Sequence, residues 1–198
     1  MVLSRSADGW TAGTPLSALT DGRDALLAVA MNGELLPLAH GFPVRLVVPG
    51  LYGYVSATKW VTELKVTRFD ADEGYWTPRG WSALGPIKTA SRIDVPREGT
   101  SVPGGDVVVA GVAWAQHRGV ARVEVSVDGG DWSEATLAAE PTVDAWRLWS
   151  WTWPQAAPGR HTLAVRATDG VGETQPGDLA PPPPDGATGW HTITVRVG

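Results

Sequence analysis

The second half of the chain consists of short apolar segments at regular intervals. These segments span residues 107–114, 120–127, 146–153, 161–168 and 190–197, and tight-turn residues such as Asp128-Gly129-Gly130 separate them. Regular strand–turn spacing over about 100 residues is typical of two packed antiparallel sheets, so the pattern predicts an immunoglobulin-like β-sandwich over residues 91–198. The interruption at 175–189 contains four consecutive prolines and is predicted to be a polyproline-type surface loop.

The first 90 residues have a less regular pattern. Residues 1–24 are predicted to be loop, with one short helix at Pro15–Leu19. Apolar runs flank Asn32-Gly33, and this dipeptide favours a hairpin because both residues tolerate positive φ. Residues 60–67 alternate like a strand, and residues 68–90 are predicted to be an ordered connection. The fold class expected for the whole chain is therefore mainly β, divided into residues 1–90 and 91–198.

The composition of the chain excludes several classes of function. Apolar residues make up 43% of the chain, enough for a packed core. The formal net charge is -5 and no basic stripe is present, so a nucleic-acid partner is not expected. No apolar run reaches the length of roughly 18 residues that crosses a bilayer, and Met1–Ser6 holds no leader. The compartment stays open, with export or membrane tethering through an upstream segment among the possibilities.

Three basic side chains form the main candidate for a site. His40 and Arg45 flank a turn that contains Pro43, and Lys59 stands where a glycine-containing loop enters the strand at 60–67. Arginine binds phosphate through two parallel hydrogen bonds and lysine supplies a compact charge, so a phosphate-bearing ligand fits this pattern. Asp8 lies further upstream. On residue type alone, a histidine beside a glycine is more often structural than a ligand contact.

Several short motifs around these residues resemble a known family. They are Met31-Asn32-Gly33-Glu34-Leu35-Leu36-Pro37, His40-Gly-Phe-Pro-Val-Arg45, Val47-Val48-Pro49-Gly50 and Thr58-Lys59-Trp60. In this order and spacing they resemble one continuous block of the sulfite oxidase family of molybdopterin-dependent oxidoreductases. Gly85-Pro86-Ile87-Lys88-Thr89 and Ser91-Arg92-Ile93-Asp94-Val95-Pro96 are similar to the entry into that family's dimerisation domain.

The resemblance implies a specific organisation. An α+β domain of the family holds a molybdenum–molybdopterin cofactor, and an immunoglobulin-like dimerisation domain follows it. The chain would form a homodimer, and the parent enzyme would transfer an oxygen atom to or from a small anionic substrate such as sulfite. By position, the residues that resemble cofactor contacts are His40, Arg45, Ser56, Thr58, Lys59 and, less closely, Asp8.

One departure from the family limits what this chain does alone. The family binds its metal through a cysteine thiolate in the first half of the cofactor domain, and this sequence has no cysteine. The chain therefore resembles the second half of that domain plus the dimerisation domain. We expect an incomplete α+β domain with exposed apolar edges within residues 8–70, pterin contacts without a metal ligand, and no activity of the chain by itself.

Two other interpretations remain open at this point, and both are of a stand-alone β-sandwich without catalysis. The first is a binding or assembly module that is dimeric and never meets the cofactor. The second is a sugar-binding sandwich that uses a row of tryptophans. Four tryptophans bear on it, because an exposed aromatic row stacks on sugars or is buried by a partner, whereas a sandwich core is the more ordinary place for such residues. They are Trp146, Trp149, Trp151 and Trp153. The remaining histidines, His117, His161 and His191, lack a metal-ligand spacing and are interpreted as structural.

Overall fold

The computed structural model describes all of residues 1–198, and the chain divides into two compact units. The first unit comprises Met1–Ile87 together with Pro181–Gly186, and the second comprises Lys88–Ala180 together with Ala187–Gly198. Strands dominate both units, and the second is the predicted immunoglobulin-like sandwich, so the mainly β fold class is confirmed. No helix in the structure has both the length and the apolar character of a membrane span.

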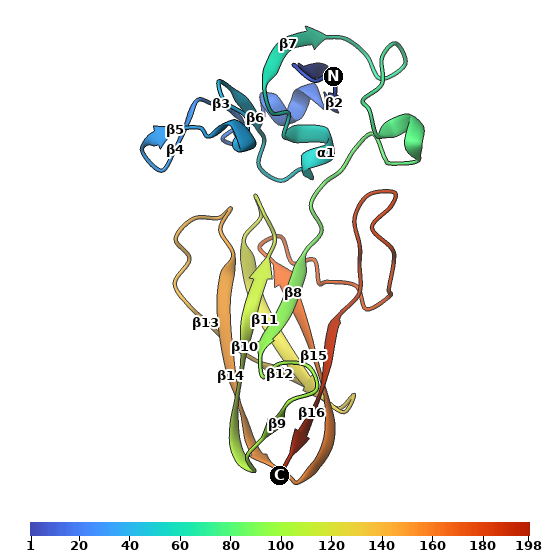
Figure 1. The fold of residues 1–198 in the computed structure, drawn as a ribbon. Helices are drawn as coiled ribbons and strands as arrows, with labels where there is room; N and C mark the ends of the chain where they lie inside the picture. The colour runs from blue at the N-terminus through green and yellow to red at the C-terminus, as the bar shows by residue number, and fades with distance from the viewer. The chain divides into compact units, whose positions relative to one another are not determined.

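The second unit consists of two sheets packed face to face (Figure 1). One has the order β13-β14-β10-β8 and the other β12-β11-β15-β16-β9. The strands of the first sheet are β8 (Ala90–Val95), β10 (Gly105–Trp114), β13 (Thr136–Leu137) and β14 (Arg147–Ala156). Those of the second are β9 (Ser101–Val102), β11 (Val120–Val127), β12 (Trp132–Glu134), β15 (Gly159–Asp169) and β16 (His191–Val197). Alternate residues of β10, β11 and β15, such as Val109, Val125 and Leu163, are fully buried between the sheets.

The tryptophans of β14 belong to this core. Trp149 and Trp153 are buried, and Trp151 packs against the same cluster while only partly covered. The core interpretation is therefore confirmed for these three residues, and they form no exposed platform for a sugar. Trp146 differs, because it precedes β14 and its residue surface is 52% exposed.

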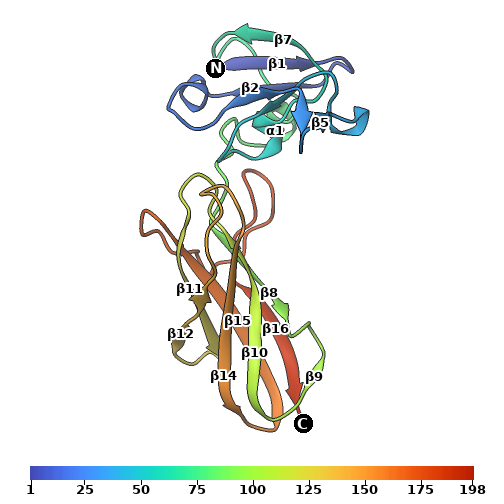
Figure 2. The same ribbon diagram turned by 90° about the vertical axis from the view of Figure 1, so that its left-hand side faces the viewer.

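The first unit is built from several small sheets (Figure 2). Three antiparallel strands, β1 (Val2–Ser6), β2 (Thr11–Thr14) and β7 (Val61–Val66), follow the order β2-β1-β7. Two further pairs join β3 (Leu26–Ala28) to β6 (Arg45–Val47), and β4 (Ala30–Met31) to β5 (Glu34–Leu35). The short helices are α1 (Gly53–Ser56) and the 3-10 turns η1 (Leu16–Leu19), η2 (Leu38–His40) and η3 (Thr77–Arg79).

Two predictions for this unit have different outcomes. The hairpin is confirmed, with Asn32 and Gly33 at φ 53° and 83° between β4 and β5. The loop predicted for residues 1–24 is wrong, because β1 and β2 lie there. Ser4 is completely buried, with its hydroxyl paired inside the protein. Small hydroxyl side chains thus occupy interior positions of these strands. Apolar residues at the same positions would have given the alternating pattern that predicts a strand.

The expected apolar surface within residues 8–70 is also present. Leu35 and Leu38 are each 71% exposed, and Leu26 and Leu27 of β3 are about half exposed. Strand β7 is covered on neither face, since every residue after Val61 is exposed. The second core of the chain is correspondingly small, formed by Ala18, Leu46 and Val48.

The polyproline segment is exposed, as predicted for a surface loop. Its residues Pro181–Gly186 belong to the first unit, where the carbonyl of Pro184 accepts hydrogen bonds from the Ser82 N–H at 2.8 Å and the Tyr54 hydroxyl at 3.3 Å. Residues far apart in sequence therefore complete this unit.

Candidate functional site

The predicted basic cluster is organised by two segments of backbone that lie against each other. The N–H of Trp60 donates to the carbonyl of Gly41 at 3.3 Å, and the N–H of Val61 donates to that of Val44 at 3.0 Å. The N–H of Leu46 donates to the carbonyl of Thr58 at 2.9 Å. These bonds bring residues 41–46 and 58–61 together, and with them the side chains of Arg45 and Lys59.

Gly41 makes this close approach possible. Its φ is +112°, and a Cβ placed there would lie 3.1 Å from the Cβ of Arg45 and 3.1 Å from the Cα of Lys59. Any larger residue would be strained by its backbone conformation and crowded by both neighbours. The glycine is visible in the sequence as part of a motif, but its role is not. The one sequence feature that could have pointed to this role is the position of Gly41 directly after His40.

Lys59 ties the cluster to the turn that ends at His40. Its Nζ donates to the carbonyl of Ala39 at 3.0 Å and lies 5.1 Å from the centroid of the Trp60 ring. The indole Nε1 of Trp60 donates to the carbonyl of Leu38 at 2.8 Å. Turn η2 is thereby fixed beside Lys59, and the side chain of His40 at its end is exposed.

Arg45 contains an unsatisfied donor. Its Nε is shielded from solvent and has no hydrogen-bond partner. Leaving a buried donor unpaired costs about 1–3 kcal/mol, and more when the group is charged. Buried polar atoms in folded proteins are nearly always paired, so an unpaired guanidinium nitrogen points to a ligand or an ordered water at this position.

Asp8 lies at the border of the same region. The N–H of the preceding Ala7 donates to the carbonyl of Trp60 at 2.9 Å, which places the start of the Asp8 turn beside the Lys59 strand entry. The N–H of Trp10 donates to Oδ1 of Asp8 at 3.0 Å, and this bond does most to lower the pKa of the exposed carboxyl, with a smaller contribution from the charge of Lys59. Asp8 is therefore an exposed anion next to the cluster.

The two hydroxyl residues of the predicted set point into the protein. Oγ of Ser56 donates to the carbonyls of Leu51 and Tyr52 at 3.1 and 3.0 Å. The hydroxyl of Thr58 is completely buried and lies 2.6 Å from that of Ser4. Both side chains are committed to the fold, so any contact from residues 56–58 to a ligand would come from the main chain.

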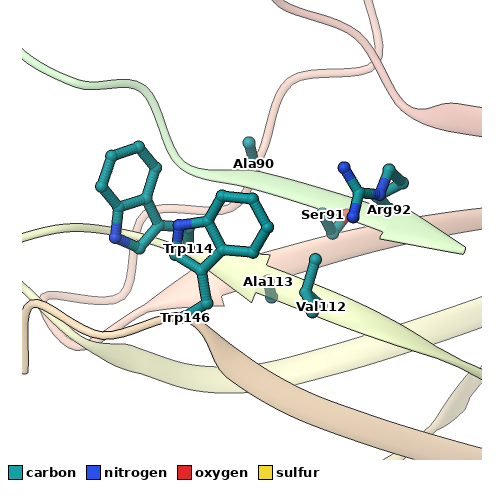
Figure 3. A pocket seen from close by; sticks show the side chains of 7 residues that line it. All are labelled: Ala90, Ser91, Arg92, Val112, Ala113, Trp114 and Trp146. Atoms are coloured by element: carbon teal, nitrogen blue, oxygen red, sulfur yellow. The ribbon is translucent and has the colours of Figure 1, made fainter. Parts of the chain in front are cut away.

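A further depression lies on the sandwich, and its lining includes Trp146 but none of the residues predicted to contact the cofactor. It has a volume of about 260 Å³, and its lining is mainly apolar. Figure 3 shows the indoles of Trp114 and Trp146 at one end and Arg92 at the other, above Val112 and Ala113 of β10. The Arg92 guanidinium carbon lies 5.5 Å from the centroid of the Trp146 ring. No group of three or more potential metal-ligating side chains occurs in the structure.

Comparison with known proteins defines the class to which the chain belongs. Residues 1–76 match the model of the oxidoreductase molybdopterin binding domain, and residues 90–165 match that of a bacterial Ig domain. The chain therefore combines an oxidoreductase molybdopterin binding domain with an immunoglobulin-like domain.

The individual relatives specify this class further. Sulfite oxidase of Gallus gallus is 34% identical over 187 residues, covering 83% of this chain and 40% of that protein. Mitochondrial sulfite oxidase of Rattus norvegicus is 33% identical, covering 94% of this chain and 39% of that protein. The crystal structure of the sulfane dehydrogenase SoxCD from Paracoccus pantotrophus superposes with a TM-score of 0.74 and 26% identity, covering 98% of this chain and 54% of that one.

The chain belongs to the sulfite oxidase family and corresponds to its C-terminal region. It spans about 40% of the length of the curated sulfite oxidases it matches. The cofactor of this family is molybdenum–molybdopterin, as the resemblance implied.

Proposed function

We propose that this chain supplies the C-terminal part of a sulfite oxidase-like enzyme. Residues 1–90 would contribute contacts to the pterin and its phosphate, and residues 91–198 would join two subunits into a homodimer. The chain by itself would be inactive, because it contains no cysteine to supply the thiolate ligand of the metal. The parent enzyme would act on a small anionic substrate.

The observation that carries this proposal is the unpaired buried Nε of Arg45 beside Gly41 and Lys59. A phosphate or pterin oxygen at this nitrogen would satisfy the donor, and glycine leaves the adjoining backbone open for close approach. His40 is exposed at the end of η2 and would add a third contact. Lys59 Nζ already donates to a carbonyl and retains two further hydrogens for an anion.

The residues present fit the phosphate-bearing end of the cofactor and do not fit its metal. When bound, molybdenum–molybdopterin supplies a two-electron redox centre. This chain would bind and orient its organic part through Arg45, Lys59 and His40. The thiolate that holds the metal would have to come from another polypeptide segment.

The proposed homodimer rests on the outer face of the sheet β13-β14-β10-β8. Val108 and Leu148 are 57% and 60% exposed there, and Trp146 beside them is 52% exposed. Val112 lies directly opposite Leu148 on the paired strands, so these apolar side chains share one face. Apolar side chains with aromatic anchors are typical of the centre of a subunit interface.

A retention experiment tests the cofactor contact. The purified chain is mixed with molybdopterin released from a carrier protein, separated by gel filtration, and assayed for bound pterin by fluorescence after oxidation. We expect the wild-type chain to retain pterin and Arg45→Ala and Lys59→Ala to lose it. Arg68→Ala is the matched control, because Arg68 pairs with Asp70 on the surface of the same unit. The proposal would be contradicted if Arg45→Ala retained as much pterin as the wild-type chain, or if the wild-type chain retained none.

A further inference from the structure

Two arginines stand directly opposite each other on the sandwich. Arg160 of β15 is paired in register with Arg196 of β16. On β16, Val195 and Val197 are buried in the core, whereas Arg196 between them is exposed. Directly opposed residues of an antiparallel pair project from the same face, so both guanidinium groups leave the outer face of the sheet side by side.

Neither guanidinium group has a partner within the protein. Arg166 of β15 pairs with Glu124 at 2.9 Å, and Arg118, in the turn before β11, pairs with Asp169 at 2.7 Å. No ion pair or side-chain hydrogen bond involves Arg160 or Arg196. The chain carries 21 acidic residues against 16 basic ones, so carboxylates are not scarce. Like charges placed directly opposite destabilise a sheet unless an anion lies between them.

The two side chains line a depression of about 220 Å³ with Glu98, Gly99, Thr194 and Val195. Its floor is fixed, because the N–H of Gly99 donates to the carbonyl of Thr194 at 2.8 Å and the N–H of Arg196 donates to that of Thr100 at 3.0 Å. Glu98 is held at the rim, where its Oε2 accepts the N–H of Thr194 at 2.7 Å. It forms no ion pair with either arginine, although its negative charge opposes that of an incoming anion.

We propose that Arg160 and Arg196 form a binding site for a tetrahedral oxyanion of the sulfate or phosphate class. Each guanidinium presents a planar fork of donors, and the two forks come from neighbouring strands. A carboxylate has two oxygens and is saturated by one fork, whereas a tetrahedral dianion has enough oxygens to engage both. This site is independent of the proposed cofactor contacts, which involve other residues in the other unit.

The test is a titration of the ¹⁵N-labelled full chain at constant ionic strength, with sulfate replacing chloride. We expect saturable shifts of the Gly99, Thr194 and Arg196 amides. Arg160→Gln and Arg196→Gln should each raise Kd at least about fivefold, because each removes a charged donor group. Glu98→Gln should lower Kd, since the amide oxygen still accepts the Thr194 N–H while the opposing charge is gone.

Controls and competing anions make the outcome decisive. Arg122→Gln removes an equal charge from β11 of the same sheet, opposite Thr168 and so at the other end of β15 from Arg160, and should leave Kd unchanged. Well-dispersed amide spectra check that each variant is folded. Methyl phosphate binding as tightly as sulfate identifies the site as one for an ester on a larger ligand. Preference for inorganic sulfate or phosphate identifies a free anion. Shifts that do not saturate, that survive both arginine substitutions, or that acetate reproduces equally would overturn the proposal.

Discussion

Nε of Arg118 lies 2.7 Å from Oδ2 of Asp169, a carboxylate that is completely buried at the end of β15. Burial by itself would raise the pKa of Asp169. The hydrogen bond from Arg118 and those from the Glu173 N–H, the Thr89 hydroxyl and the Val171 N–H outweigh burial and hold that pKa below its usual range. One charged side chain thus fixes three separate segments at this end of the sandwich.

Removing this carboxylate should destabilise the second unit strongly. Asp169→Ala removes the buried carboxylate that pairs with Arg118, and breaking a buried ion pair in this way costs about 3–5 kcal/mol. Urea unfolding followed by tryptophan fluorescence measures the loss. Asp70→Ala breaks an exposed pair with Arg68 and should cost less than about 1 kcal/mol. Similar losses for the two variants would contradict the structural role of Asp169.

His161 should make stability depend on pH. Its Nδ1 lies 2.7 Å from Oδ2 of Asp128 and its Nε2 lies 2.9 Å from the carbonyl of Ala157, so the doubly protonated ring donates to both acceptors. The hydrogen bond to Asp128 does most to raise the pKa of His161, and the bond to Ala157 adds to it. A raised folded pKa gives stability that is fully present below the unfolded value of about 6.5 and is lost as pH rises through the folded pKa.

Comparison with Asp128→Asn isolates this effect. The variant keeps an oxygen that accepts the Thr162 N–H, but it lacks the charge that favours protonated His161. We expect the difference in unfolding free energy between wild type and variant to be greatest at about pH 6, below the unfolded pKa of histidine, and to shrink as pH rises through the raised pKa of His161. His191 has a pKa lowered by burial, is present in both proteins and cancels in the difference. An NMR titration in which the His161 pKa is the same in both proteins would refute this account.

The sandwich was predictable from sequence because its strands obey a simple pattern. Val123 and Val125 of β11, like Leu163 and Val165 of β15, are completely buried and stand two residues apart along their strands, with more polar residues such as Glu124 and Ser126 following the valines. Strands β1 and β2 escaped prediction because serine, threonine and glycine occupy interior positions that other strands give to apolar residues. The hydroxyl groups of Ser4 and Thr14 are satisfied by partners far away in sequence, Thr58 and Val55 respectively, and no local pattern reveals such partners.

The candidate site was only partly predictable for a related reason. The resemblance selected Arg45 and Lys59, and the backbone bonds of Gly41 place these two residues together. It did not reveal that the Thr58 hydroxyl is bonded to Ser4, 54 residues away. The opposition of Arg160 and Arg196 was likewise invisible, since it depends on the register between β15 and β16.

Leu148 offers a test of the proposed subunit interface. Because it is 60% exposed, Leu148→Glu should leave the fold intact while placing a charge at the centre of the apolar face. We expect sedimentation equilibrium to show a dimer for wild type and a monomer for the variant. Thr192→Glu adds the same charge on the other sheet, at another exposed position, and should remain dimeric. Dimers formed equally well by both variants would exclude this face as the interface.

Gly41 provides the sharpest link between local backbone and site. Gly41→Ala combines an unfavourable φ of +112° with contacts of 3.1 Å to Arg45 and Lys59, whereas Gly33→Ala meets nothing within 4 Å at φ +83°. The control should therefore lose only the backbone preference of glycine, about 1 kcal/mol, and the Gly41 variant should lose about 1–3 kcal/mol more. Hydrogen exchange of the Leu46, Trp60 and Val61 amides reports on this directly, because their bonds join the two segments. We expect their protection to fall in Gly41→Ala and to be retained in Gly33→Ala. If both variants protect these amides as well as wild type, the close approach at Gly41 does not position Arg45 and Lys59.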